Sequence, residues 1–370
     1  MTKYGILSIQ RAVEQEQVTT FDNLYHLVGQ NTGNLLFTNA VWNHIGGEKV
    51  RVGFTFNPDE INESLDALII PAANWMSANV DFSKLADLIE RVRIPTVLIG
   101  LGAQNDSFSD VIQVPAGTQR FARAVAERSH AISVRGEYTR KVLEGLGISN
   151  VVVTGCPSLY NDFRSFEAPR RVHVRPERGL LHSTRFSADH APFADTHSSH
   201  RDIFRLAFQH KMDLLLQSER EEMHILTAPD ASAGFDERLK GLLMKIYASP
   251  SWSALEAYVK AHARLFFQVN YWSKALEKYD YVFGTRLHGT VMALNSGVPA
   301  FMLHHDSRTK ELCDFAGIPS ADSQSFQLSL SGIQRSIERT DFSAYYTRRL
   351  ANKQTYKAFL HANGLALNEF

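Results

Sequence analysis

The sequence predicts an α/β protein made of two Rossmann-like domains with mostly parallel sheets. Short apolar runs, bounded by glycine or proline, alternate with segments of helical spacing along nearly the whole chain, as they do when helices join parallel strands. The length of 370 residues exceeds what one hydrophobic core usually supports. An arginine-rich, aperiodic stretch at 166–179 interrupts the alternation, so we expect one domain at 1–168 and another at 169–370.

Composition excludes several classes of protein. Lysine plus arginine equals aspartate plus glutamate at 39 each, so no net charge would attract nucleic acid. Two cysteines, Cys156 and Cys313, do not make a disulfide framework and fit a reducing compartment. No run approaches the roughly 20 apolar residues of a membrane span, and the first residues lack a signal-peptide core. We expect a soluble, cytoplasmic protein; peripheral membrane contact and oligomeric state stay open.

In the first domain, apolar runs predict strands that alternate with helices. The predicted strands are 4–9, 50–56, 65–70, 95–99, 131–134 and 151–154, and the predicted helices are 35–45, 82–93, 119–128 and 139–146. Asn74 and Trp75 follow the strand at 65–70, where the indole could stack on a sugar or pack in the core. The loop at 29–34 could present backbone N–H groups to an anion or a sugar, or be only a turn with a helix cap.

The second domain continues the alternation. The predicted strands are 180–181, 213–217, 223–227, 280–283 and 299–303, and the predicted helices are 202–211, 237–247, 254–276, 290–295 and 345–362, of which the last could pack back on the first domain. The polar segment 186–201 holds His190, His197 and His200, but no paired zinc spacing is present, so we predict no metal site.

The stretch from 279 to 310 predicts an anion site that contains a histidine. The stretch predicts two strands joined by a helix. Arg286 and His288 follow the first strand, and Arg308 and Lys310 follow the second. In an open parallel sheet, ligands bind at the edge formed by the carboxyl ends of the strands. A helix that begins at His288 would add free N–H groups and the positive end of its dipole.

The two halves also contain similar short sequences. Asp66-Ala-Leu-Ile-Ile-Pro in the first half parallels Asp280-Tyr-Val-Phe-Gly-Thr in the second, although the match is too short to establish a repeat. Two Rossmann-like domains whose carboxyl edges face across a cleft form the glycosyltransferase-B-like architecture. We therefore expect the active site between the domains.

Several motifs resemble those of the polysaccharide pyruvyl transferase family. They are Gly284-Thr-Arg-Leu-His-Gly289, Ala293-Leu-Asn-Ser-Gly-Val-Pro299, Val134-Arg-Gly-Glu137, Thr154-Gly-Cys-Pro-Ser158 and Asn31-Thr-Gly-Asn34. They occur in the family's order over most of the chain, and the block around Arg286 and His288 is the specific one. Asn34, Gly136 and Cys156 stand where the family has aspartate.

The resemblance implies transfer of pyruvate from phosphoenolpyruvate onto two hydroxyls of a hexose, giving a cyclic ketal, without a cofactor. The hexose would belong to a surface polysaccharide or to its lipid-linked or nucleotide-linked precursor. His288 would be the general acid and Arg286 would grip the donor. The implied donor-binding residues are Arg286, Leu287, His288, Gly289, Lys310 (or Arg308 beside it), Arg135 and Arg185. The implied acceptor-binding residues, on the first domain, are Asn31, Gly33, Asn34, Asn74 and Trp75.

Two other functions stay open. A nucleotide-sugar glycosyltransferase of the same fold would need a carboxylate for the ribose, and Glu311 and Asp314 are candidates. A non-catalytic, carbohydrate-binding relative would account for the replaced aspartates. His304 and His305 also remain candidates for the site, because either could reach it while the other packs.

Overall fold

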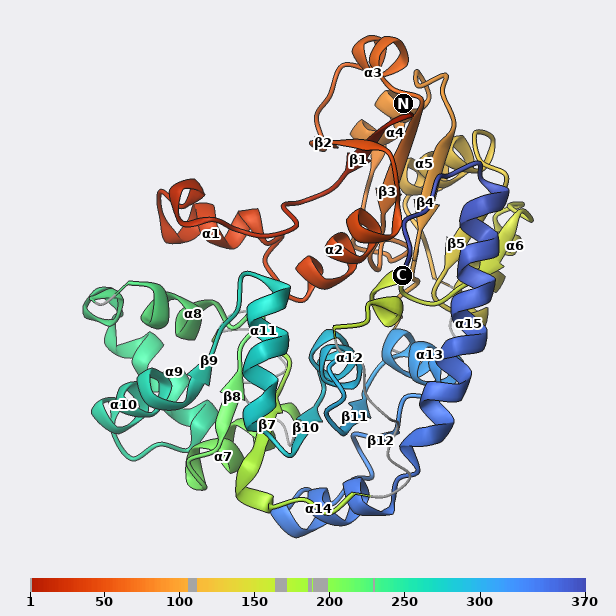
Figure 1. Ribbon diagram of the computed structural model, residues 1–370. Coiled ribbons are helices and arrows are strands. Elements are labelled where there is room, and N and C mark those ends of the chain that lie inside the picture. The colour runs from red at the N-terminus through yellow and green to blue at the C-terminus, as the bar shows by residue number, and fades with distance from the viewer. Residues whose placement is uncertain (1, 106–111, 164–171, 186–187, 189–198, 229) are drawn as a thin grey trace.

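The computed structural model describes residues 2–105, 112–163, 172–185, 188, 199–228 and 230–370. It is an α/β protein in which every pair of named strands is parallel. The strands form two separate groups, one from each half of the chain (Figure 1). The predicted fold class is therefore confirmed. The expected boundary between 168 and 169 falls outside the described residues and stays a prediction.

The first half has a four-stranded sheet in the order β2-β1-β3-β4 and a further parallel pair, β5 and β6. A bridge between Leu101 and Val134 links the pair to the end of β4. The strands are β1 (Lys3–Leu7), β2 (Glu48–Val52), β3 (Ala67–Pro71), β4 (Thr96–Ile99), β5 (Ile132–Val134) and β6 (Val151–Val153). The helices are α1 (Phe21–Leu27), α2 (Asn34–His44), α3 (Pro58–Ser64), α4 (Ser83–Ile89), α5 (Ala116–Ala126), α6 (Glu137–Gly145) and the 3-10 turn η2 (Pro157–Tyr160).

The second half has a six-stranded sheet in the order β12-β11-β10-β7-β8-β9. Its strands are β7 (Gly179–His182), β8 (Asp213–Leu215), β9 (Ala263–Arg264), β10 (Tyr281–Gly284), β11 (Ala300–His304) and β12 (Ser320–Asp322). Its helices are α7 (Ser199–Gln209), α8 (Arg220–Thr227), α9 (Glu237–Tyr247), α10 (Trp252–His262), α11 (Val269–Ala275), α12 (Leu287–Asn295), α13 (Ser307–Ala316), α14 (Leu330–Arg339) and α15 (Phe342–Ala362).

Two predicted elements were wrong. Residues 223–227 are part of helix α8 rather than a strand. The prediction failed because Glu221 and Glu222 are buried on that helix, so its charged residues do not mark a solvent-facing side and the helical periodicity is hidden. The segment 254–276 is not one helix: Ala263 and Arg264 leave α10 to form β9 at the edge of the sheet. No glycine or proline marks that break, so the sequence gives no local signal for it.

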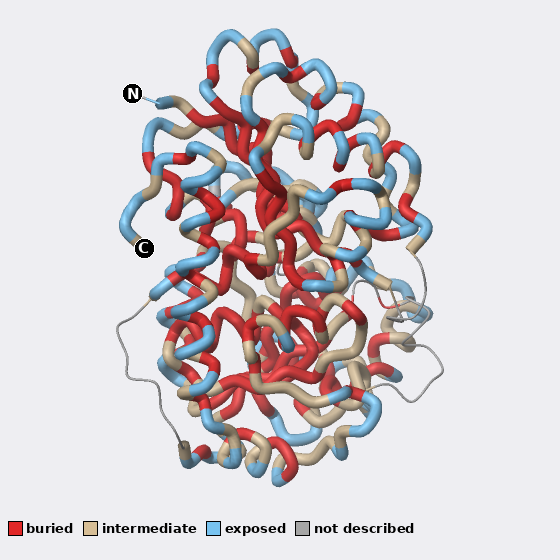
Figure 2. The backbone as a smooth tube through the Cα atoms, turned by 90° about the vertical axis from the view of Figure 1, so that its right-hand side faces the viewer, coloured by how far each residue is buried: buried red, intermediate tan, exposed pale blue. Residues whose placement is uncertain are grey.

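The two halves are joined by packing as well as by the chain. One hydrophobic cluster contains Leu36 and Phe37 of α2 together with Val291 of α12, and buried segments run through both halves in Figure 2. Figure 1 shows α15 running alongside both halves. Lys353 of α15 pairs with Asp162 at 2.8 Å, and Asn363 after the helix accepts a hydrogen bond from the backbone N–H of His130 at 3.0 Å. In the part of the chain that is described, no helix has the length and apolar character needed to cross a membrane.

Candidate functional site

A small pocket lies between the carboxyl edges of the two sheets, and we call it the anion pocket. Its lining residues follow β3 and β5 in the first half and β8, β10 and β11 in the second, with further residues from the loop before α2 and from α2 itself. They are Asn31, Asn34, Phe37, Ala73, Asn74, Arg135, Gln217, Thr285, Arg286, Leu287, His288 and Arg308. The pocket is thus where two facing parallel sheets are expected to bind a ligand.

The turn from β10 into α12 is fixed by glycine. A Cβ atom on Gly284 would lie 1.7 Å from the carbonyl oxygen of His182, so only glycine fits there. Two residues later, the backbone N–H of Arg286 donates to Nδ1 of His182 at 2.9 Å. Arg286 is the N-cap of α12, and this places Leu287 and His288 in the first turn beside the pocket.

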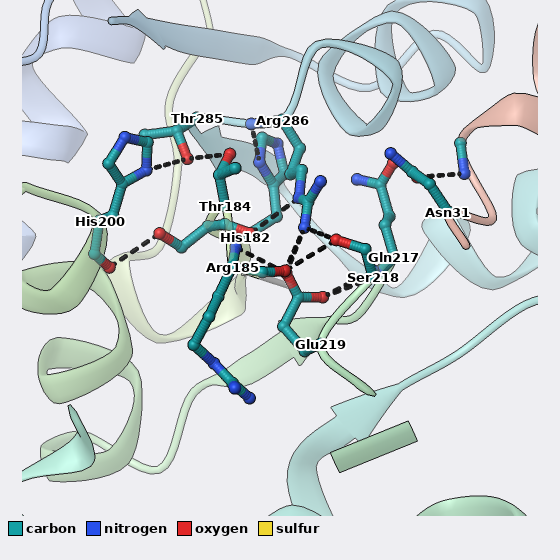
Figure 3. Close-up of polar contacts among 12 residues, drawn as sticks. Asn31, His182, Thr184, Arg185, His200, Gln217, Ser218, Glu219, Thr285 and Arg286 are labelled. Atoms are coloured by element: carbon teal, nitrogen blue, oxygen red, sulfur yellow. Dashed lines mark hydrogen bonds and ion pairs between the residues drawn. The ribbon is translucent and has the colours of Figure 1, made fainter. Parts of the chain in front are cut away.

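Polar groups of the second half hold the guanidinium of Arg286 in place (Figure 3). It donates to the carbonyl oxygens of Ser183 at 3.0 Å and Arg185 at 2.9 Å, and also to the hydroxyl of Ser218. It forms an ion pair with Glu219 at 2.5 Å, in which both side chains are almost completely buried. Arg286 is therefore pre-oriented at the pocket wall, with Glu219 as its counterion.

Two further arginines line the same pocket. Arg135, from the first half, donates to the carbonyl oxygens of Gly100 at 2.9 Å and Ala72 at 3.1 Å and to Oδ1 of Asn74 at 2.9 Å. Arg308, in the first turn of α13, pairs with Asp306 at 3.4 Å. No lining residue of this pocket is acidic. Three guanidinium groups around one small volume favour a multiply charged anion.

His288 lies next to these arginines and packs against Phe37, with ring centroids 5.7 Å apart. Its Nε2 atom is 3.7 Å from Sγ of the buried Cys156, which in turn accepts a hydrogen bond from the hydroxyl of Ser158 at 3.0 Å. Burial is the main cause that lowers the pKa of His288 well below its usual value, followed by repulsion from Arg135, Arg308 and Arg286. These surroundings therefore favour the neutral imidazole.

Two predicted donor-binding residues lie away from the anion pocket. Lys310 pairs with Asp314 at 2.7 Å on the exposed side of α13, and it is Arg308 that reaches the pocket. Arg185 is fully buried and pairs with Glu221 at 2.7 Å and with Glu222. Its side chain is thus held by buried carboxylates, and only its carbonyl oxygen contacts Arg286.

Gly289 lies immediately behind the pocket wall. A Cβ atom there would lie 2.9 Å from the ring of His182 and 3.1 Å from Nε2 of Gln217. Glycine therefore allows the first turn of α12 to pack closely on these two side chains.

The residues predicted to bind an acceptor lie on the first-half side. Asn31, Asn34 and Asn74 line the anion pocket, whereas Trp75 lines a second pocket that adjoins it. Gly33 has no side chain to offer, but it lets the two halves approach closely: a Cβ there would lie 2.5 Å from Oε1 of Gln217 and 3.1 Å from Cβ of His288.

The sequence analysis missed Phe37 and Gln217, and it did not assign Cys156 a place beside His288. Gln217 could have been found, because it ends a predicted strand at the same sheet edge as Arg286. Phe37 and Cys156 carry no such local signal, because their contacts with His288 join distant parts of the chain.

The remaining candidates lie elsewhere. His305 packs on His200 with ring centroids 4.5 Å apart, and neither it nor His304 lines the anion pocket. Glu311 accepts hydrogen bonds from Thr139, and Asp314 pairs with Lys310, so neither carboxylate faces the pocket.

Histidine, cysteine and acidic side chains form no group that could hold a metal ion within the described ranges. His190 and His197 lie outside those ranges.

Comparison with known proteins gives one family and a set of similar structures. The family model for polysaccharide pyruvyl transferase matches residues 31–307. A search of curated proteins found no significant match.

The solved structures that resemble the chain share little of its sequence. HepE from Anabaena, in complex with UDP and glucose, has 9% identity and a TM-score of 0.48 over 98% of this chain and 100% of its own. MnaA from S. aureus, in complex with UDP, has 11% identity and a TM-score of 0.45 over 100% of both chains. The UDP-N-acetylglucosamine 2-epimerase of Rickettsia bellii has 11% identity and a TM-score of 0.44 over 98% and 96%.

Proposed function

The chain belongs to the polysaccharide pyruvyl transferase family, and on that premise we propose that it transfers pyruvate from phosphoenolpyruvate onto two hydroxyls of a hexose. The product would be a cyclic ketal on a sugar of a surface polysaccharide or its precursor. The second half would bind the donor and the first half the acceptor. Phosphoenolpyruvate would be a substrate, available in the cytoplasm, and no cofactor would be needed.

The observation that carries the proposal is the convergence of Arg135, Arg286 and Arg308 on one pocket beside His288. Phosphoenolpyruvate places a carboxylate and a phosphate on one small carbon skeleton, so its site needs several cationic donors. The arginines come from both halves of the chain, and an anion held by all of them would sit at the junction of the two sheets. No lining carboxylate would repel it.

His288 would supply the proton for the reaction. Proton transfer from the imidazolium to the methylene carbon converts that carbon to a methyl group and leaves an oxocarbenium-like centre at the neighbouring carbon. One sugar hydroxyl attacks this centre, and the second hydroxyl then replaces the phosphate, whose C–O bond breaks with the electron pair leaving on oxygen. Of the two hydroxyl protons, one restores His288 and the other leaves with phosphate, so the atoms balance.

The bound donor would also make His288 a competent acid. Burial and the three arginines hold the pKa of His288 low. The negative charges of phosphoenolpyruvate would offset the arginines and raise that pKa, so protonation would accompany donor binding. The acid would thus be charged only when its substrate is present.

The test is incubation of the protein with phosphoenolpyruvate and methyl galactosides, glucosides and mannosides. We expect phosphate release together with an acid-labile pyruvate group on at least one sugar. Calorimetry should show that phosphoenolpyruvate binds, and thermal shifts with UDP-glucose provide the comparison for a nucleotide-sugar glycosyltransferase. The proposal fails if phosphoenolpyruvate neither binds nor releases phosphate with any hexoside. Binding without turnover would favour the non-catalytic relative.

A further inference from the structure

One segment of the first half, residues 13–28, packs on the second half, and we call it the α1 arm. The backbone N–H of Val13 donates to the carbonyl oxygen of Phe267 at 3.2 Å. Within α1, Phe21 stacks on His224 of α8 with ring centroids 4.4 Å apart. Figure 1 shows α1 set apart from the first-half sheet. The arm therefore ties the first half to the elements that support the other side of the anion pocket.

Tyr25 makes the arm's contact closest to Arg286 in the chain of hydrogen bonds. Its hydroxyl donates to the carbonyl oxygen of Ser218 at 3.0 Å, and the residue is 7% exposed. Burial, followed by the negative charge of Glu219, raises the pKa of Tyr25 to about 12. The hydroxyl therefore keeps its proton at neutral pH and remains a hydrogen-bond donor.

A second contact holds the neighbouring peptide group. The backbone N–H of Thr32 donates to the carbonyl oxygen of Gln217 at 2.8 Å. The first half thus holds the carbonyl oxygens of two consecutive residues, Gln217 and Ser218, that follow β8 in the second half.

The segment 217–219 is also what holds Arg286. The hydroxyl of Ser218 accepts a hydrogen bond from Arg286, and Glu219 forms the ion pair with it at 2.5 Å. The carboxylate of Glu219 also accepts from the backbone N–H groups of Gln217 at 2.7 Å and Ser218 at 3.1 Å. The carbonyl group that Tyr25 holds belongs to the peptide bond between Ser218 and Glu219, the two residues whose side chains bind Arg286.

Loss of the Tyr25 hydroxyl would therefore reach Arg286. A buried carbonyl oxygen that loses its hydrogen bond costs free energy, and the planar peptide group can regain a partner only by turning as a unit. Such a turn would move the side chains of Ser218 and Glu219 together, and Arg286 with them. Binding and catalytic groups are sensitive to shifts of about 1 Å.

We propose that Tyr25 is a positioning residue for Arg286, which it orients at the anion pocket through the peptide bond between Ser218 and Glu219. Tyr25 does not itself line that pocket. The inference rests on the proposed function for the identity of the anion as phosphoenolpyruvate, but not for the orientation of Arg286. It makes a segment of the first half part of the support of the donor site in the second half.

Tyr25→Phe tests the proposal, because it removes the hydroxyl and keeps the ring that packs on Phe21 at 5.8 Å between centroids. The matched control is Tyr258→Phe. Tyr258 is 5% exposed, and its hydroxyl donates to the carbonyl oxygen of Met212 at 2.8 Å. Each variant loses one buried hydrogen bond from a tyrosine to a backbone carbonyl, so both should be folded and lose similar thermal stability.

The first measurement needs no ligand. Nitrogen-15 NMR of the whole chain follows the Nε–H group of Arg286, which donates to the carbonyl oxygen of Ser183, and the signal is assigned by its loss in Arg286→Lys. Tyr25→Phe should speed hydrogen exchange of this group by about ten-fold or more, because the guanidinium is held less firmly. Tyr258→Phe should leave the exchange rate and the chemical shift unchanged.

The second measurement is the Kd of phosphoenolpyruvate by calorimetry. Tyr25→Phe should weaken binding about ten-fold, and Tyr258→Phe should stay within two-fold of the unmodified protein. Ser218→Ala removes the hydroxyl that contacts Arg286. If Tyr25 acts through Ser218, the losses of Tyr25→Phe and Ser218→Ala should not add in the double variant.

The proposal is overturned if the Arg286 signal of Tyr25→Phe matches that of the unmodified protein, or if Tyr258→Phe changes it equally. Additive losses in the double variant would also overturn the route through Ser218. Failure of the proposed function has a different signature, namely absence of phosphoenolpyruvate binding and of phosphate release in the unmodified protein. The NMR measurement contains no phosphoenolpyruvate, so it decides this inference in either case.

Discussion

The chemistry of single residues centres on His288 in the anion pocket, where burial and three arginines lower the pKa of its imidazole. If phosphoenolpyruvate binds there, its charges should raise that pKa and the complex should take up a proton near pH 7. Calorimetry in buffers of different ionisation enthalpy measures this uptake. His288→Gln should still bind phosphoenolpyruvate but without the uptake, and its turnover should fall by roughly a hundred- to ten-thousand-fold. Equal proton uptake by this variant would assign the titrating group elsewhere.

Cys156 lies beside His288, and the motif resemblance implies an aspartate at this position. A carboxylate within about 4–6 Å of an imidazole raises its pKa by roughly one to three units, whereas a neutral thiol does not. We therefore expect Cys156→Asp to move the alkaline limit of turnover to higher pH. Cys156→Ser, which adds no charge, should leave that limit in place. Coincident pH profiles for the two variants would show that this position does not tune His288.

At the scale of single elements, helix α13 presents two cations with different surroundings. Arg308 lines the anion pocket, and Lys310 pairs with Asp314 on the exposed side. Arg308→Ala should weaken phosphoenolpyruvate binding about ten- to a hundred-fold, the usual loss for a charge-assisted hydrogen bond. Lys310→Ala should change the Kd by less than two-fold. Similar losses for both variants would mean that long-range attraction, rather than contact, draws the anion to this helix.

The same helix caps a helix of the other half. Helix α6 has Gly136 as its N-cap, which offers no side chain, and Glu311 of α13 accepts hydrogen bonds from the N–H and hydroxyl of Thr139 instead. A Cβ on Gly136 would lie 2.1 Å from Cγ of Glu311, so the glycine makes room for this contact. A glutamate from the facing half thus caps this helix, where the motif resemblance implies an aspartate at the N-cap itself.

Burial of Glu311, whose effect the hydrogen bonds from Thr139 oppose, should make the protein less stable as pH rises. Burial is the main cause that raises the pKa of Glu311 from 4.5 to about 7. Between these values the folded state binds the proton more tightly than the unfolded state, so stability is full below pH 4.5 and falls as pH rises through 7. The loss is up to roughly 3 kcal/mol. Urea unfolding should show this slope, and Glu311→Gln should remove it. An unchanged slope in the variant would assign it to other groups.

For the molecule as a whole, sequence reasoning succeeds where the signal is local. The strand, turn and first helical turn around Arg286 and His288 follow from neighbouring residues, and so does their position at a sheet edge. The choice between Arg308 and Lys310 does not follow from neighbouring residues. Side chains two positions apart on a helix point about 200° apart, so only one of the two can face the pocket, and the start of α13, which decides which one, was not predicted. The predicted role of Arg185 in donor binding could not be checked from the sequence for another reason. Its partners Glu221 and Glu222 lie on a separate helix that was not predicted.

The relation between the two halves gives the last prediction. Arg135 belongs to the first half and Arg308 to the second, yet both line one pocket. If one anion contacts both, removing either arginine lets it shift toward the other, and the two losses should not add. A double-mutant cycle on the Kd of phosphoenolpyruvate with Arg135→Ala and Arg308→Ala should therefore give a coupling energy of about 0.5–3 kcal/mol.

The cycle needs a control for structural damage, because Arg135 also holds the carbonyl oxygens of Gly100 and Ala72. Arg135→Lys keeps the charge but loses the planar fork, so it should fall between the unmodified protein and Arg135→Ala in affinity. Losses that add within about 0.5 kcal/mol would mean that the arginines act on separate groups. The donor would then not bridge the halves, and its binding would not draw them together.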